Sequence, residues 1–203
     1  MEIVDRDLDD ALKLKPGVER VAALVSWFQG LFAPDFPVPI LVGGAAVELY
    51  TGGAYTTGDL DFVGEIPRPV ANKLIDAGFR KEGRHWIFER GKVFIERPGS
   101  SLDFDDPAVQ IEVGGKSVVA ASPESMLIDR LASWQFWGSS VDGVNAYLLW
   151  NTQEKRLDRG RIAVLAKNRG VEKALEKLAE LTAGFGGRLP ADRELEQWAE
   201  RFP

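Results

Sequence analysis

The chain has 203 residues, of which 45% are hydrophobic, and its formal net charge is −6 at pH 7. This length and apolar content predict a globular protein with a real core, made of one domain or of one domain with a helical extension. The absence of cysteine excludes disulfides and thiolate zinc sites, and the single histidine leaves little imidazole chemistry. Any metal is therefore expected to be Mg²⁺ or Mn²⁺ bound by oxygen ligands.

The acidic, amphipathic start of the sequence lacks the basic and apolar regions of a signal peptide. No apolar stretch approaches the length that spans a bilayer. We therefore expect a cytoplasmic protein without a membrane partner. The negative net charge disfavours non-specific nucleic-acid binding over the whole surface.

Helices and strands alternate in the first part of the chain, as judged from apolar spacing and from glycine and proline breaks. In chain order they are a helix at 17–32, a strand at 39–44, a short helix at 45–50, a strand at 59–64 and a helix at 67–79. Two aromatic-rich runs at 84–89 and 92–97, separated by Arg90-Gly91, then predict a β-hairpin. His85 is expected to pack at an edge of this hairpin.

The remaining sequence changes from strand to helix patterns. One or two further strands are predicted at 109–121, around a Gly-Gly pair. Ser122 then suits a helix N-cap and Pro123 the first helical position. Amphipathic spacing predicts later helices at 171–184 and 191–202.

These elements predict an α+β fold in two parts. An α+β domain with a mixed β-sheet and flanking helices is expected over residues 1–121, and a helical region over 122–203. The acidic stretch with Asp103, Asp105 and Asp106 does not place the glycine and glutamate of a calcium loop in register, so a solvated loop is expected there.

Two aspartates in the strand at 59–64 are the first candidates for chemistry. Residues two apart in a strand face the same side, about 7 Å from each other, so Asp59 and Asp61 should project together while Leu60 and Phe62 enter the core. Two like charges at this separation are costly unless a cation compensates them, and a pair of Mg²⁺ ions roughly 3.5–4 Å apart would do so. The alternative is a strand end at which both carboxylates are simply solvated.

The glycine pair upstream strengthens the first of these interpretations. Gly43 and Gly44 end a buried strand and precede a short helix. Glycines allow a ligand to approach the backbone closely, and the amides at a helix N-terminus bind phosphate. A phosphate cradle and a metal pair are therefore predicted at neighbouring strand ends.

The order Gly-Gly, short helix, then Thr-Thr-Gly-Asp-Leu-Asp-Phe resembles the signature of the polymerase-β-type nucleotidyltransferase superfamily. More narrowly, it is similar to small bacterial proteins related to the abortive-infection (AbiE-type) nucleotidyltransferases. The resemblance implies a nucleotidyltransferase-like mixed sheet in which Asp59, Asp61 and Glu96 are the catalytic, metal-binding carboxylates. It also implies that the glycine pair and Thr57 contact the nucleotide.

A second segment, Ser-Pro-Glu-Ser-Met-Leu-Ile-Asp-Arg-Leu-Ala, resembles the helical half of the same proteins. By that resemblance Asp129 and Arg130 face the nucleotide, and Asp142 begins the next helix. The resemblance implies an enzyme that moves a nucleoside monophosphate from an NTP such as ATP to a hydroxyl, with Mg²⁺ or Mn²⁺. The acceptor would be tRNA, a partner protein or a small molecule, and the setting a toxin–antitoxin or defence system.

Two alternatives of other classes stay open. A catalytically inactive, nucleotide-binding regulator or antitoxin is suggested by Gly44, where many relatives carry serine, and by Tyr55, where relatives often carry arginine. The second alternative is an interaction module in which Asp59 and Asp61 are simply solvated. Basic residues interleaved with acidic ones suit either an RNA acceptor or an ordinary solvated face. They are Lys155, Arg156, Arg159, Arg161, Lys167, Arg169 and Lys173.

Overall fold

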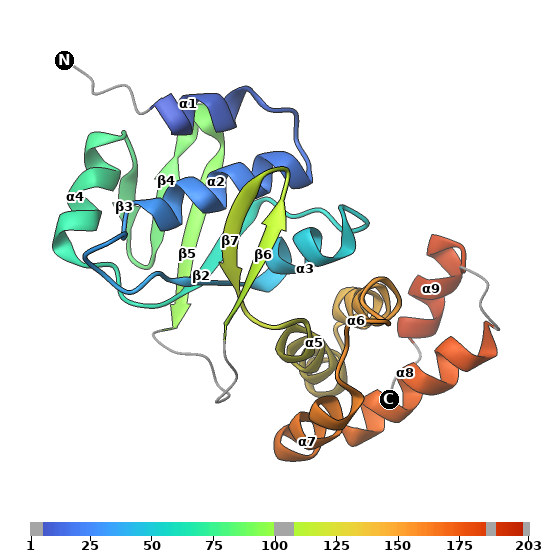
Figure 1. Ribbon diagram of the computed structural model, residues 1–203. Coiled ribbons are helices and arrows are strands. Elements are labelled where there is room, and N and C mark those ends of the chain that lie inside the picture. Colours follow the sequence, from blue (N-terminus) through green and yellow to red (C-terminus); the bar gives the residue numbers. More distant parts are fainter. Residues whose placement is uncertain (1–5, 100–107, 186–189, 201–203) are drawn as a thin grey trace. The chain divides into compact units, whose positions relative to one another are not determined.

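The computed structural model describes residues 6–99, 108–185 and 190–200 (Figure 1). The acidic stretch at 103–106 and the end of the last predicted helix lie outside these residues. The chain forms two compact units, Met1–Ser122 and Pro123–Pro203, each of which is considered by itself.

The first unit is built on a mixed sheet, which has seven strands in the described residues, in the order β3-β4-β5-β2-β1-β7-β6. β1 pairs with β7 and β2 with β5 in parallel, and the other neighbours are antiparallel. The strands are β1 (Ile40–Val42), β2 (Asp59–Val63), β3 (Arg80–Glu82), β4 (His85–Phe88), β5 (Val93–Gly99), β6 (Val109–Val113) and β7 (Lys116–Ala120). The predicted α+β class with a mixed sheet is confirmed.

Four helices accompany the sheet in the described part of the first unit. They are α1 (Arg6–Lys13), α2 (Val18–Gly30), α3 (Gly43–Thr51) and α4 (Arg68–Asp76). Helix α2 runs across one face of the sheet (Figure 1), and the buried rings of Phe28 and Phe62 meet there with centroids 4.5 Å apart. Because α2 is rich in apolar residues, it covers the sheet face into which β2 sends its apolar side chains.

The second unit consists of helices in its described residues. These are α5 (Pro123–Trp137), α6 (Ser140–Thr152), α7 (Arg159–Arg169), α8 (Glu172–Gly184) and α9 (Asp192–Ala199). Trp134 is 1% exposed, its Nε1 donates to the carbonyl of Ala199 at 2.8 Å, and its ring lies 4.5 Å from that of Trp198. One buried tryptophan thus joins α5 to α9. Within the described ranges, no helix is long and apolar enough to cross a membrane.

Most predicted elements lie where the sequence places them, with a few corrections. The helix predicted at 45–50 begins earlier, at Gly43, and a short strand that was not predicted, β3, pairs with β4. The hairpin of β4 and β5 is present, and its connection contains Arg90-Gly91 as predicted but is wider than two residues. A 3₁₀ turn, η1 (Glu89–Gly91), joins the strands, and Lys92 follows it with φ 51°. Gly91 of this turn packs against α1, because a Cβ there would lie 2.7 Å from Leu12 Cδ2.

Candidate active site

The two aspartates of β2 face the side of the sheet opposite to α2. Leu60 and Phe62 are 5% and 1% exposed, whereas Asp59 is exposed and Asp61 half-buried. This alternation follows from the two-residue period of a strand and confirms that the aspartates project together.

The register of three neighbouring strands brings the predicted carboxylates into one row. Asp61 pairs with Val42 of β1 on one side and with Glu96 of β5 on the other. Register partners on adjacent strands point to the same face, and strands lie about 4.8 Å apart. Glu96 therefore lies beside Asp61, although 35 residues of sequence separate them.

The carboxylate of Glu96 is held by the hairpin. Arg84 Nε lies 2.8 Å from Oε1, and His85 Nε2 lies 3.3 Å from Oε2. His85 thus faces the carboxylate row, as its register with Glu96 requires, and the expectation that it simply packs at a strand edge is wrong. The guanidinium of Arg84 therefore forms an ion pair with one carboxylate oxygen of Glu96.

The carboxylates of Asp59, Asp61 and Glu96 are the candidate ligands of a divalent metal ion. Three carboxylates on one sheet face offer the oxygen ligands that Mg²⁺ and Mn²⁺ prefer, so the residue types fit. However, no group of three or more acidic or histidine side chains in the described residues comes close enough to hold a metal ion. Glu96 would have to leave Arg84 to join Asp59 and Asp61.

The glycine pair lies directly against the aspartate strand. Gly43 has φ +66°, and a Cβ there would collide with Oδ2 of Asp61. A Cβ on Gly44 would lie 2.9 Å from Oγ1 of Thr57. Only glycine fits at either place without a shift of its neighbours, so the structure brings Gly43, Gly44, Thr57 and Asp61 together.

Helix α3 starts at this point. Its N-cap residue, Val42, provides no side-chain hydrogen bond to the first amides. The first turn of a helix favours negative charge, because its amides point outward and the peptide dipoles add up. The start of α3 is thus suited to a phosphate group beside the carboxylates.

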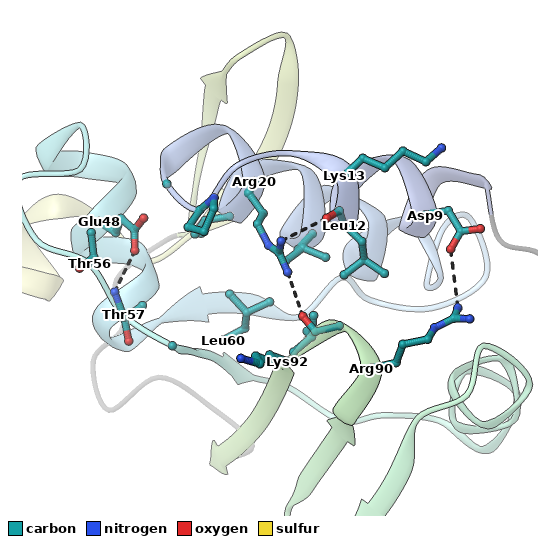
Figure 2. A pocket seen from close by; sticks show the side chains of 17 residues that line it. Asp9, Leu12, Lys13, Arg20, Glu48, Thr56, Thr57, Leu60, Arg90 and Lys92 are labelled. Atoms are coloured by element: carbon teal, nitrogen blue, oxygen red, sulfur yellow. Dashed lines mark hydrogen bonds and ion pairs between the residues drawn. The ribbon is translucent and has the colours of Figure 1, made fainter.

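Glu48 is a site residue that sequence reasoning missed. It is 1% exposed in α3, and its Oε2 accepts a hydrogen bond from the backbone N–H of Thr57 at 2.9 Å (Figure 2). Burial raises the pKa of the Glu48 carboxyl, and the bond from Thr57 opposes this only in part. The signal in the sequence was a single carboxylate within the apolar run Ala-Ala-Val-Glu-Leu-Tyr. Its bond fixes the segment that leads into β2.

Asp129 and Arg130 belong to the second unit. Arg130 donates from Nη2 to Asp129 at 2.5 Å and from Nη1 to Asp142 at 2.7 Å. Helix α6 begins two residues before Asp142, whose backbone N–H donates to the hydroxyl of Ser139 at 3.4 Å, so a helix does start there as expected. A contact of Asp129 or Arg130 with a nucleotide stays a prediction.

Comparison with known proteins gives one informative likeness. The chain resembles the crystal structure of an antigenic nucleotidyltransferase-like protein from Paracoccidioides brasiliensis, with a TM-score of 0.57 and 16% sequence identity. The likeness covers 89% of this chain and 99% of that one. No protein-family model and no curated protein matches the sequence. At this identity the likeness concerns the fold alone, and the chain has a nucleotidyltransferase-like fold.

Proposed function

We propose that this protein is a metal-dependent nucleotidyltransferase, which transfers a nucleoside monophosphate from an NTP to a hydroxyl of an acceptor. The observation that carries the proposal is the row Val42–Asp61–Glu96, which sets two carboxylates of different strands beside the start of α3. The nucleotidyltransferase-like fold supports it. Phosphate-binding amides and carboxylate ligands then lie next to each other, as phosphoryl transfer requires.

The residues of the first unit have distinct roles in this proposal. The triphosphate lies at the first amides of α3, beside Gly43 and Gly44, and the hydroxyl of Thr57, which packs against Gly44, contacts it from the side. Asp59 and Asp61 would hold Mg²⁺ or Mn²⁺, and Glu96 would either complete this metal site or act as the base. The bound metal supplies positive charge that offsets the charge of the reacting phosphates.

The reaction itself is an in-line displacement. The acceptor oxygen forms a bond to the α-phosphorus while the bond from that phosphorus to the β-phosphate oxygen breaks, and pyrophosphate leaves. A carboxylate accepts the hydroxyl proton, and Glu96 is the candidate because it lies at the side of the row away from α3. Asp129 and Arg130 are proposed as further nucleotide-binding residues.

The finer proposal is an AbiE-type enzyme of the cytoplasm that acts in a toxin–antitoxin or defence system. It rests on the Thr-Thr-Gly-Asp-Leu-Asp-Phe and Asp-Arg-Leu-Ala segments. The acceptor is then tRNA, a partner protein or a small molecule.

A second candidate is a nucleotide-binding regulator that no longer turns over. Glu96 favours it, because Arg84 and His85 hold both of its oxygens. Such a protein binds an NTP at the start of α3 but forms no product. An interaction module without any nucleotide is the third class that the test below separates.

The test is calorimetric titration of each of the four NTPs, with and without Mg²⁺, on the wild type and on Asp61→Asn. The matched control is Asp76→Asn, an exposed carboxylate at the end of α4. We expect binding of at least one NTP that needs Mg²⁺, is lost in Asp61→Asn and persists in Asp76→Asn. Labelled NTP then distinguishes turnover from binding alone. Binding that is absent, or indifferent to metal and to Asp61→Asn, contradicts the transferase.

A further inference from the structure

A cleft lies on the face of the sheet opposite to Asp59 and Asp61. It has a volume of about 940 Å³ and is bounded by α1, α2, the segment before β2 and the start of β5 (Figure 2). Leu60 lines it, and Leu60 points away from Asp59 and Asp61 because neighbouring residues of a strand face opposite sides. Neither these aspartates nor Glu96 line the cleft. The cleft therefore lies on the other side of β2 from the carboxylate row, and it shares only Glu48 and Thr57 with the candidate active site.

Positive charge dominates the walls of this cleft. Lys13, Arg20, Arg90 and Lys92 line it, against the carboxylates of Asp9 and Glu48. Asp9 lies 3.9 Å from Arg90, and Lys13 pairs with Asp10 at 2.7 Å. Burial raises the pKa of the Glu48 carboxyl. This basic cleft contrasts with the net charge of −6 for the whole chain. Its excess of cations calls for an anion.

Arg20 is fixed in place without neutralisation of its charge. Its Nη1 donates to the carbonyls of Leu12 and Leu14 at 3.2 and 3.3 Å, and its Nη2 donates to the carbonyl of Gly91 at 2.9 Å. In the part of the chain that the structure describes, neither Arg20 nor Lys92 forms an ion pair with a carboxylate. The guanidinium is preorganised by neutral acceptors, so an incoming anion meets its full charge.

Lys92 follows Gly91, whose carbonyl holds this guanidinium, and it has a conformation that lysine disfavours. Its φ is 51°, and it is the one non-glycine residue with positive φ in the described ranges. Gly91, which precedes it, packs so closely that a Cβ there would lie 2.7 Å from Leu12 Cδ2. The turn therefore holds the lysine at the lip of the cleft at a conformational cost, which is a feature of binding sites.

The floor of the cleft is apolar. Leu24, Leu60 and Val93 form part of it, and the hydroxyl-bearing residues Thr56 and Thr57 lie at one side. Ligand pockets of about 300–1,000 Å³ commonly combine such an apolar floor with a few oriented polar groups. A cationic rim over an apolar floor suits an organic anion with a ring, and the fork of Arg20 with Lys92 suits a phosphate group.

We propose that this basic cleft binds a phosphorylated small molecule of about the size of a mononucleotide, with its phosphate on Arg20 and Lys92 and its apolar part on Leu60 and Val93. No metal takes part, because the anion meets two cations directly. This binding uses none of the carboxylates that the proposed transferase activity needs.

The test uses AMP, GMP, CMP and UMP as probes, titrated by calorimetry into the full chain in EDTA. We expect at least one of them to bind saturably, with an affinity that falls as salt rises. Lys92→Asn removes the charge while asparagine tolerates the positive φ, and it should weaken binding by about tenfold, the effect of one lost charge-assisted hydrogen bond. Lys155→Asn, at an exposed lysine of the second unit, is the matched control.

Two further variants keep the result decisive. Lys92→Gly also suits the positive φ, and it replaces the asparagine variant if that one unfolds. Asp61→Asn should leave metal-free binding of the monophosphate unchanged. Failure of all four monophosphates to bind overturns the proposal, and so does binding that survives both Lys92 variants or is lost in Asp61→Asn. Loss of Mg²⁺-dependent NTP binding alone would bear only on the active site.

Discussion

Replacement of Gly44 by alanine tests the packing at the start of α3, and we expect it to destabilise the protein. The new Cβ would lie 2.9 Å from Oγ1 and 3.0 Å from Cβ of Thr57, and 3.3 Å from Cε1 of Tyr55. Forced contacts of this kind cost about 1–3 kcal/mol, whereas alanine in place of glycine inside a helix gains roughly 0.5–1 kcal/mol. The difference predicts a loss of about 1 kcal/mol in the free energy of unfolding, and a Tm about 3–5 °C lower.

Gly30→Ala is the matched control, because Gly30 ends α2 in the same unit and a Cβ there would meet no atom within 4 Å. Thermal and urea unfolding of both variants give the comparison. Thr57→Gly removes both contacts of Thr57, so the double variant Gly44→Ala/Thr57→Gly should recover about 1 kcal/mol relative to the sum of the single changes. A Gly44→Ala protein as stable as Gly30→Ala, or strict additivity in the double variant, would refute the packing argument.

Two further predictions concern charges near the site. The raised pKa of Glu48 means that its contribution to stability is complete below the unfolded-state pKa and is lost as the pH rises through the folded-state pKa. Glu48→Gln keeps an oxygen acceptor for the N–H of Thr57 without a charge. The Tm of this variant should therefore exceed that of the wild type at pH 8 and approach it near pH 4. A difference in Tm of the same size at both pH values contradicts this. Arg84→Gln should raise the affinity for Mn²⁺ about two- to fivefold by releasing Glu96 from an exposed ion pair. Water-proton relaxation measures that affinity, and Arg97→Gln is the control. An unchanged Mn²⁺ affinity in Arg84→Gln argues against Glu96 as a ligand.

The sequence alone determined much of the local structure at the site. The two-residue period follows from the extended backbone of a strand, so Asp59 and Asp61 had to share a face once Leu60 and Phe62 were buried. Gly43 likewise marked the place where a strand ends and a helix begins, because few other residues adopt its φ of +66°. Both features depend on residues within a few positions of each other.

The tertiary structure decided which distant groups meet. The register of β2 on β5 sets Glu96 beside Asp61, and the hairpin register then sets Arg84 and His85 on Glu96. Such register follows from the burial of whole strand faces and not from any local pattern, so composition and spacing cannot supply it. The basic cleft has the same origin, because its cations come from α1, from α2 and from the turn before β5, which only the packing of helix on sheet brings together.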